Sequence, residues 1–484
     1  MIHRSRFDVR GFAPNPGPIL ATLLLFAAGC QSGPRERGAA ESISLATGSG
    51  ELVTFRVEGG PLDEPSDHDA SLPAEEAVRR AVATDPGLQA ALARVRIAMA
   101  DAEQARLLPN PVLNFIVRWG PGKPQIEVSL AQDLMQCLQI PRRSSAADNR
   151  LGKAAADAVT VALDVVAGVQ ERYGEVQASD RLIPLLEGRL DLLRKLAAVA
   201  KNRLEAGEGV RGDVTTLDAQ RVALEVEIAD AQLRRSENRL RLARLIGEPS
   251  GTGTWTLDPW AAPVLGTEPE ARWVDTALMH RPEVQAVVWQ LAALGDEYAL
   301  TGLAPWEGLS VGVDSQRDDQ SFFTGPSIAT PIPIFDMGQA KRARVTAEQV
   351  EARHDLTLVK RRVVEEVRVA YQSLLANEAN LRRVTSELIP LQQQRRQQAE
   401  DAYRAGQTDV TPLFLAEQDL EATQAKSIDI ERQAVLAMVR LRRAVGGPGF
   451  ASSVGAAAKA SPVASPADSR ITPDRPLASA NTRP

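Results

Sequence analysis

The feature that most constrains this chain is an internal repeat of nearly 200 residues. The segment "DPGLQAALARVRIAMADAEQARLLPNPVLNF" begins at Asp85, and "RPEVQAVVWQLAALGDEYALTGLAPWEGLSV" begins 196 positions later at Arg281. Further on, Gly207 in "RLEAGEG" matches Gly406 in "YRAGQTD", 199 positions apart. A solenoid repeat is far shorter, roughly 20 to 50 residues. The sequence therefore predicts two similar halves, at residues 72–250 and 272–447, joined by a short connection at residues 251–271.

Each half has the same order of predicted elements. A helix of moderate length is followed by an alternating, strand-like stretch, and then by a very long helical pattern, at 142–206 and 339–405. About 65 helical residues span roughly 100 Å. Each long pattern ends at a glycine and returns as a helix of roughly 50 Å. The first helix and the return helix together nearly equal the long one, so we expect them to stack end to end beside it. The predicted short helices are 86–107 and 213–246 in the first half, and 282–303 and 411–445 in the second.

The alternating stretch of the first half predicts a β-hairpin with one apolar and one mostly polar face. Its turn is Gly120-Pro121-Gly122. The second hairpin, from Leu309 to Ile334, has a weaker pattern around the polar turn "DSQRDDQS". Taken alone, each hairpin also fits a half-buried sheet on a soluble domain. The apolar face of the first hairpin carries Leu113, Phe115, Val117, Trp119, Ile126, Val128 and Leu130.

The helical pairs have little interior, yet their apolar residues spread over more than one stripe. In the return helix of the first half, Val222, Val226, Leu233 and Leu240 accompany Ile228 and Leu242. Such a helix must pack on two sides, which suits a cylinder of helices. A soluble coiled coil is the alternative.

The strands point to an assembly of several chains. Four strands cannot close a barrel in lipid, where an open edge is not tolerated, and the smallest transmembrane barrels have about eight strands. Three chains would supply twelve strands and twelve helical columns. The predicted fold class is therefore mainly α with a small β part: a trimeric transmembrane β-barrel with four strands per chain, continued by a long α-helical barrel. A family resemblance, given below, implies that this is an outer-membrane β-barrel with a periplasmic α-helical barrel.

The N-terminal segment has the features of a secretory signal peptide, predicted at residues 1–29. Arginines precede an apolar run from Ile19 to Ala28, and Cys30 follows Ala27-Ala28-Gly29. This arrangement resembles a bacterial lipobox, which implies an acylated (palmitate-bearing) Cys30 and an outer-membrane lipoprotein. Residues 30–71 are then a lipid-anchored linker, and the Ala-, Ser- and Pro-rich tail at 448–484 is predicted to be disordered.

Several function classes are disfavoured by the sequence. The formal net charge of −6 gives no reason to expect nucleic acid. The four histidines, at positions 3, 68, 280 and 354, lack metal-ligand spacing. No phosphate loop or nucleophile elbow occurs, so we expect no enzyme activity, no cofactor and no bound metal.

Taken together, these segments resemble the TolC-type outer-membrane factors of tripartite efflux systems. The resemblance covers about residues 72–447 and is carried by the doubled "AVATDPGLQAA" and "ALMHRPEVQAV", by "GPSIATPIPIFDMGQAKRAR", and by "RLEAGEGVRGDVTTLDAQ" and "RAGQTDVTPLFLAEQDL". It implies a homotrimeric duct in the outer membrane that extends into the periplasm. Its implied partners are a periplasmic adaptor (membrane fusion) protein, an inner-membrane pump of the RND type and outer-membrane lipid. Within this family, the sequence resembles the heavy-metal and copper branch of lipoproteins more closely than other branches.

The resemblance also implies roles for particular residues. The glycine turns Ala206-Gly207-Glu208 and Ala405-Gly406-Gln407 would be periplasmic tips that dock the adaptor. As αL helix caps they also have a purely structural role. Acidic side chains near the tips are candidates for a periplasmic gate, although acids at helix starts are also favoured by the helix dipole. These candidates are Asp213, Asp218, Asp409 and Glu417.

Two functions follow from these observations. The first is a passive trimeric duct that exports small molecules or metal ions from the periplasm or pump to the exterior. The alternative is a lipid-anchored periplasmic coiled-coil scaffold without a pore.

The segment from Gly325 to Ile334 is expected to be the last barrel strand, with Asp336 and Gly338 forming a tight turn into the second long helix.

Overall fold

The computed structural model describes most of the chain between residues 33 and 451. The described ranges are 33–48, 52–57, 71–120, 123–207, 209–260, 268–317, 321–405, 407–408 and 411–451. The predicted signal peptide, Cys30, Glu208, Gly406, Asp409 and most of the predicted tail therefore lie outside the described residues. In the described part, no helix is both long and apolar enough to cross a membrane.

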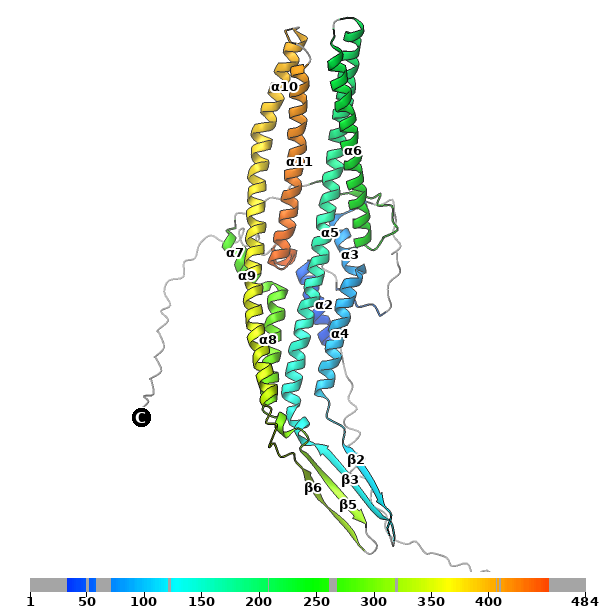
Figure 1. Ribbon diagram of the computed structural model, residues 1–484, viewed down its shortest axis with the longest axis vertical. Coiled ribbons are helices and arrows are strands. Elements are labelled where there is room, and N and C mark those ends of the chain that lie inside the picture. The colour runs from blue at the N-terminus through cyan, green and yellow to red at the C-terminus, as the bar shows by residue number, and fades with distance from the viewer. Residues whose placement is uncertain are drawn as a thin grey trace, which may run out of the picture.

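Each repeat contributes one long helical column and one composite column beside it (Figure 1). In the first repeat the long helix is α5, and α4 and α6 lie beside it. In the second, α9 and α10 form the long column, and α8 and α11 lie beside it. The bounds are α3 Ala74–Thr84, α4 Pro86–Arg106, α5 Leu134–Glu205, α6 Arg211–Leu245, α7 Glu270–His280, α8 Pro282–Thr301, α9 Gln339–Arg383, α10 Ile389–Arg404 and α11 Thr411–Val445.

The long helices differ in detail from the sequence prediction. α5 begins at Leu134, because the side chain of Asp133 caps it by accepting from the backbone N–H of Gln136 at 2.8 Å, and it continues through Pro141 and Pro184. In the second repeat a π-helical turn, Val384–Leu388, separates α9 from α10 directly before Pro390. Such a turn accommodates a proline, which has no N–H to donate within a helix.

The predicted end-to-end stacking of the short helices is confirmed by contacts. The carbonyl oxygen of Ala444, near the end of α11, accepts from the guanidinium of Arg281, which precedes α8. In the first repeat, Gly247 after α6 lies against Thr84 at the end of α3, directly before α4. Each pair of short helices therefore forms one interrupted column beside its long helix.

All four long strands belong to one antiparallel sheet in the order β2-β3-β5-β6. The two hairpins pair through β3 and β5, whose register places Leu130 opposite Val313. β2 and β6 are edge strands with no further neighbour in the described chain. β6 ends at Ala329 rather than at Ile334, so the predicted last strand was too long. The bounds are β2 Val112–Arg118, β3 Gln125–Asp133, β5 Ser310–Arg317 and β6 Phe322–Ala329.

Two smaller features were missed by the sequence analysis. A helix, α2 (Gly33–Thr47), lies within the predicted linker, and Ile43 on it is fully buried in the core of the first repeat. A parallel pair of two-residue strands, β1 (Ser71–Leu72) and β4 (Thr256–Leu257), joins the two ends of the first repeat at mid-height. The hydroxyl of Tyr173 links them by donating to the Leu72 carbonyl and accepting from the Asp258 N–H.

The N-terminal helix packs against the segment that follows α11. There Gly447 has a φ of +120°, and a Cβ on it would lie 2.0 Å from the carbonyl oxygen of Ala46. Phe450 stacks on His280 with ring centroids 4.4 Å apart. The first residues of the predicted disordered tail, up to Ala451, are therefore folded onto the body of the protein, which corrects that part of the prediction.

Candidate functional site: sheet, joint and tips

The sheet has one apolar and one polar face, as the alternation predicts. Directly opposed residues share a face in an antiparallel pair, and the register places Leu113 opposite Leu130, Phe115 opposite Val128, and Val117 opposite Ile126. The predicted apolar residues on β2 and β3 thus lie on one surface. Across the second hairpin the same face is mixed: it carries the apolar Val313, Pro326 and Phe322 and also the polar Ser315, Arg317 and Thr324.

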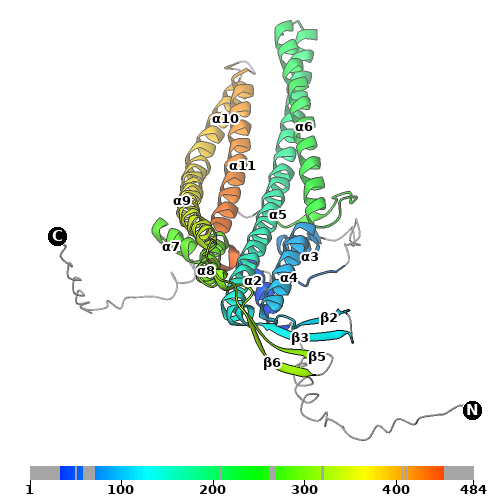
Figure 2. The ribbon, with the colours of Figure 1, turned by 60° about the horizontal axis from the view of Figure 1, so that its bottom comes forward.

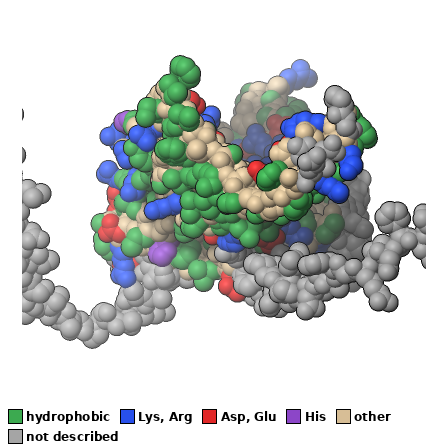
Figure 3. Space-filling view, turned by 90° about the horizontal axis from the view of Figure 1, so that it is seen from below, with side chains coloured by type: hydrophobic (Ala, Val, Ile, Leu, Met, Phe, Trp, Pro, Cys, Tyr) green, Lys and Arg blue, Asp and Glu red, His purple; other side chains and the backbone are tan. Residues whose placement is uncertain are grey.

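The opposite face of the sheet is mostly polar. Asn114 faces Ser129, which in turn faces Asp314, and Glu127 faces Gln316. The apolar face has no cover in the described chain: Leu113 is 66% exposed and Trp119, after β2, is 83% exposed. Figure 3, seen from the sheet end, shows apolar side chains across the middle with Lys and Arg on either side. A two-faced sheet with an open apolar surface suits a boundary between water and lipid.

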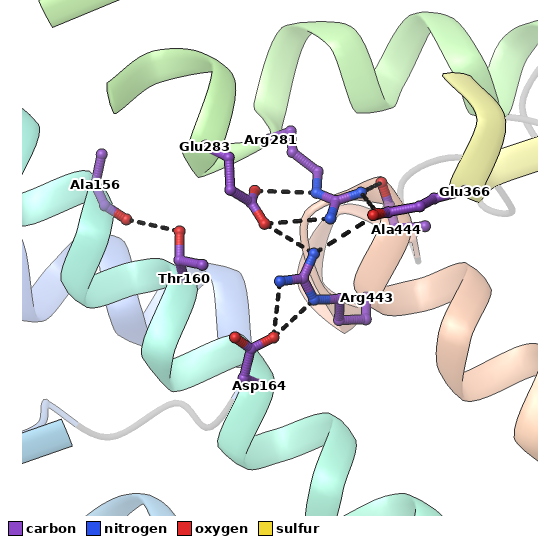
Figure 4. Close-up of polar contacts among 8 residues, drawn as sticks. All are labelled: Ala156, Thr160, Asp164, Arg281, Glu283, Glu366, Arg443 and Ala444. Carbon is purple, nitrogen blue, oxygen red and sulfur yellow. Dashed lines mark hydrogen bonds and ion pairs between the residues drawn. The ribbon is translucent and has the colours of Figure 1, made fainter. Parts of the chain in front are cut away.

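A charged joint fills the gap where α11 ends and α8 begins (Figure 4). Arg281 is only 3% exposed and donates to the carboxylate of Glu283 at 3.0 and 3.2 Å. It also pairs with Glu366 of α9 at 2.6 Å. Arg443 reaches Glu283 at 2.8 Å and Asp164 of α5 at 2.7 Å. The joint therefore ties four helices, from both repeats, at one level.

Burial perturbs the acids of this joint. It raises the pKa of the Glu283 carboxyl, with Arg281 opposing the shift. It also raises the pKa of Asp164, again against the effect of Arg281. Close by, Thr160 donates to the Ala156 carbonyl at 3.2 Å and stays within its own helix. The joint borders a cavity of about 590 Å³ between α5, α9 and α11.

None of the joint residues was predicted as functional from the sequence. A signal was available in the repeat itself, because Arg281 aligns with Asp85. In the first repeat, Asp85 caps its own helix by accepting from the Leu88 N–H at 2.7 Å. In the second, the aligned Arg281 makes no such cap and instead holds the end of α11. The two halves thus differ at the very position where their columns are interrupted.

From the joint toward the tips, ion pairs join α5 of the first repeat to α11 of the second. The sign of the charges reverses along this seam: near the joint, α11 supplies the arginines, and toward the tips, α5 supplies them. The pairs are Arg443–Asp164, Arg440–Glu171, Arg432–Glu175, Arg181–Glu431 and Arg189–Glu421. A reversed charge pattern favours one register of two helices over shifted ones. At the end of the seam nearer the tips, burial raises the pKa of the Glu421 carboxyl to about 7; Arg189 opposes this shift and Glu417 adds to it.

The tips lie at the end of the molecule opposite the sheet (Figures 1 and 2). Gly207 has a φ of +81°, as expected for an αL cap, and its N–H donates to the Leu204 carbonyl. Ala405 ends α10, and Gln407 donates from its backbone to the Ala402 carbonyl. The two turns, Ala206-Gly207 and Ala405 with Gln407, thus cap their helices, and their role in docking stays a prediction.

The predicted gate acids are not brought together in the described structure. Asp218 on α6 pairs with Arg221 at 3.5 Å, and Glu417 on α11 pairs with Arg396 at 2.5 Å. The side chain of Asp213 and all of Asp409 lie outside the description. The residues that the structure describes contain no group of three or more His, Cys, Asp or Glu that could hold a metal. Cys137 is a free, half-buried cysteine at the start of α5.

Comparison with known proteins agrees with this architecture. Residues 273–447 match the family described as outer membrane efflux protein. The chain is 23% identical over 398 residues to the cobalt-zinc-cadmium resistance protein CzcC of Cupriavidus metallidurans. This match covers 79% of this chain and 92% of CzcC. Among solved structures, the outer-membrane channel OprN has a TM-score of 0.64 at 19% identity, over 83% of this chain and 98% of that one. The outer membrane protein VceC of Vibrio cholerae has a TM-score of 0.66 at 17% identity, over 77% and 96% of the two chains.

The fold and the family match define the class: a mainly helical channel protein of the outer membrane. The resemblance to TolC-type outer-membrane factors seen in the sequence is thereby confirmed. This chain is the outer-membrane channel component of a tripartite efflux system, as its sequence predicts.

Proposed function

We propose that three copies of this chain share one β-barrel in the outer membrane and one helical cylinder below it, forming a passive export duct. The observation that carries the proposal is the four-stranded sheet, whose apolar face is uncovered and whose edge strands β2 and β6 have no partner in the described chain. Unpaired backbone groups are not tolerated in hydrocarbon. Pairing β6 of one copy with β2 of the next would satisfy both edges at once.

The helices support the same assembly. Val222, Val226, Leu233 and Leu240 on α6 are each at least 50% exposed, whereas Ile228 and Leu242 are buried against α5. With Ala229 and Ser236, the exposed residues follow the alternating spacing of four and three that defines a coiled-coil seam. We call these six residues the α6 stripe. A neighbouring copy would cover the α6 stripe.

The finer parts of the proposed function follow the resemblance. The tips at Gly207 and Gly406 would dock a periplasmic adaptor, an RND-type inner-membrane pump would supply the energy, and Cys30 would carry a lipid anchor. For the cargo, the named activity of CzcC, cobalt-zinc-cadmium resistance, favours divalent metal ions. The acids near the tips, including Asp218 and Glu417, would face the narrowest part of the duct.

The test compares two substitutions on adjacent residues of β3. Val128→Arg places a cation on the apolar face, and Ser129→Arg places the same cation on the polar face. A cation in the middle of a lipid-facing barrel surface costs about 2–4 kcal/mol. We therefore expect Val128→Arg to lose the trimer and outer-membrane fractionation, and Ser129→Arg to retain both. Equal behaviour of the two variants, or a monomeric wild-type chain in detergent, would refute the shared barrel.

A further inference from the structure

The strands of this sheet are too short to cross the membrane by themselves. β2 has 7 residues, β3 has 9, and β5 and β6 have 8 each. At about 3.3 Å per residue and a tilt of roughly 40°, they would cover only about 18 to 23 Å of a lipid-facing apolar band about 25 Å tall. Several ångströms of the hydrocarbon layer are therefore left without an apolar protein surface from the strands. This height is close to that of one helical turn, about 5.4 Å.

Exposed apolar side chains occur where each hairpin runs into its long helix. At the start of α5, its first residue Leu134 is exposed, and Leu138, one turn further on, is 58% exposed. Between β6 and α9, Phe335 is 92% exposed. We call this set the junction belt; its members are Leu134, Leu138, Ile332, Ile334, Phe335 and Met337.

The junction belt follows directly along the chain from the apolar face of the sheet. Phe322, Pro326 and Ile328 lie on that face of β6, with the polar Thr324 among them, and Ile332 and Ile334 come in the segment that joins β6 to α9. Pro331 and Pro333 between them donate no backbone hydrogen bond. The N–H of Ile334 closes a small turn onto the Ile332 carbonyl at 2.9 Å. The two prolines and this turn thus reduce the number of backbone N–H groups that lack a partner in an apolar setting.

Cations begin directly beyond the junction belt. Lys341 and Arg342 are exposed in the first turn of α9, and Arg142 lies on α5 with 62% of its side chain exposed. Lys341 pairs with Glu307 at 3.1 Å, and Arg142 pairs with Asp296 at 3.0 Å. The change from large apolar side chains to ion-paired cations within one or two turns is the change expected between acyl chains and headgroups.

We propose that the periplasmic leaflet of the outer membrane covers the junction belt, so that the first turn of α5 and the segment before α9 are immersed in acyl chains. Phospholipid is the partner of this surface, and its phosphates would lie at the level of Lys341, Arg342 and Arg142. This inference rests on the proposed insertion of the sheet in the membrane. It adds that the membrane boundary lies on the helices rather than at the ends of the strands.

The experiment measures the depth of single fluorescent labels. In a Cys137→Ser background, cysteine replaces Leu138, Phe335, Val117 or Thr357 in turn, and each variant is labelled with an environment-sensitive fluorophore. The background without an added cysteine corrects for any label on Cys30. The protein is reconstituted in vesicles of phosphatidylethanolamine and phosphatidylglycerol with brominated acyl chains, which quench only labels in the hydrocarbon. Val117 reports the apolar sheet face, and the exposed Thr357, five turns along α9, reports the aqueous surface.

We expect bromolipid to quench labels at Leu138, Phe335 and Val117, and to leave the label at Thr357 bright. Quenching at Val117 alone would overturn the junction belt inference and leave the proposed barrel intact. Labels at Leu138 and Phe335 that resist both bromolipid and aqueous iodide would show that a second copy covers them, which also overturns the inference. Absence of quenching at Val117 would instead refute membrane insertion of the sheet.

Discussion

Arg281, which precedes α8, donates a hydrogen bond to the carbonyl oxygen of Ala444 near the end of α11, at 3.2 Å. The bond joins two helices that lie end to end, and it meets one of the last carbonyls of α11, which have no partner within their own helix. Arg443, the neighbour of Ala444, reaches across to Asp164 of the other repeat. One charged joint therefore holds a column together and holds that column against its neighbour.

The joint predicts unequal effects for two arginines. Arg281→Ala removes the buried cation that pairs with both Glu283 and Glu366, and we expect a loss of about 3 kcal/mol in the free energy of unfolding. The control is Arg440→Ala, because Arg440 is 65% exposed and pairs with Glu171 at 3.4 Å. An exposed pair contributes about 0–1 kcal/mol. Thermal unfolding of the purified protein, followed by circular dichroism, measures both, and a similar small change in each would contradict a structural role for the joint.

The seam between α5 and α11 predicts a pH dependence. Burial raises the pKa of Glu421 from 4.5 to about 7 in the folded protein, so folding favours its protonated form. Its contribution to stability is present below pH 4.5 and is lost as the pH rises through about 7. We expect Glu421→Gln to lose less stability than wild type between pH 4.5 and pH 8. Unfolding measured across this range tests the prediction, and parallel curves for the two proteins would argue against it.

The α6 stripe predicts that the trimer depends on residues outside the sheet. Leu233 is 59% exposed on the α6 stripe, and Leu233→Glu would place a charge in a seam between copies. The adjacent Gln232 is exposed off the stripe, so Gln232→Glu is the matched control. We expect the first variant to dissociate in detergent at concentrations where the second stays trimeric, as measured by light scattering. Trimers of equal stability would mean that α6 does not lie at the interface.

Two glycines predict opposite effects of the same substitution. Gly447→Ala places a Cβ against the Ala46 carbonyl in a backbone conformation that favours glycine, and we expect a loss of about 1–3 kcal/mol. Gly188, in the middle of α5, has open space where a Cβ would go. There Gly188→Ala should stabilise the helix by about 0.5–1 kcal/mol. The unfolding midpoint of each variant shows whether it is more or less stable than wild type. An unchanged midpoint for Gly447→Ala would mean that α2 does not depend on this contact.

Local rules made much of the architecture readable from the sequence. The repeat showed two halves, the alternation at Leu113, Phe115 and Val117 showed a two-faced sheet, and Gly207 marked the end of a helix. Each of these depends on neighbours a few residues apart, or on a repeated pattern. The turn before α9 was predicted as well, and Asp336 does accept from the Gly338 N–H at 2.8 Å.

Only the tertiary structure decided how the halves meet. The sequence predicted the columns, but Glu366 pairs with Arg281 and Asp164 pairs with Arg443 from helices far away along the chain, and nothing in the local pattern selects these two acids. The helix α2 was missed because the composition of its segment is polar and glycine-rich, and its stability comes from burying Ile43 in a groove built by other helices. The periodicity of apolar residues indicates which faces of a helix or strand must be buried. Packing and charge across the whole fold determine which element buries each face.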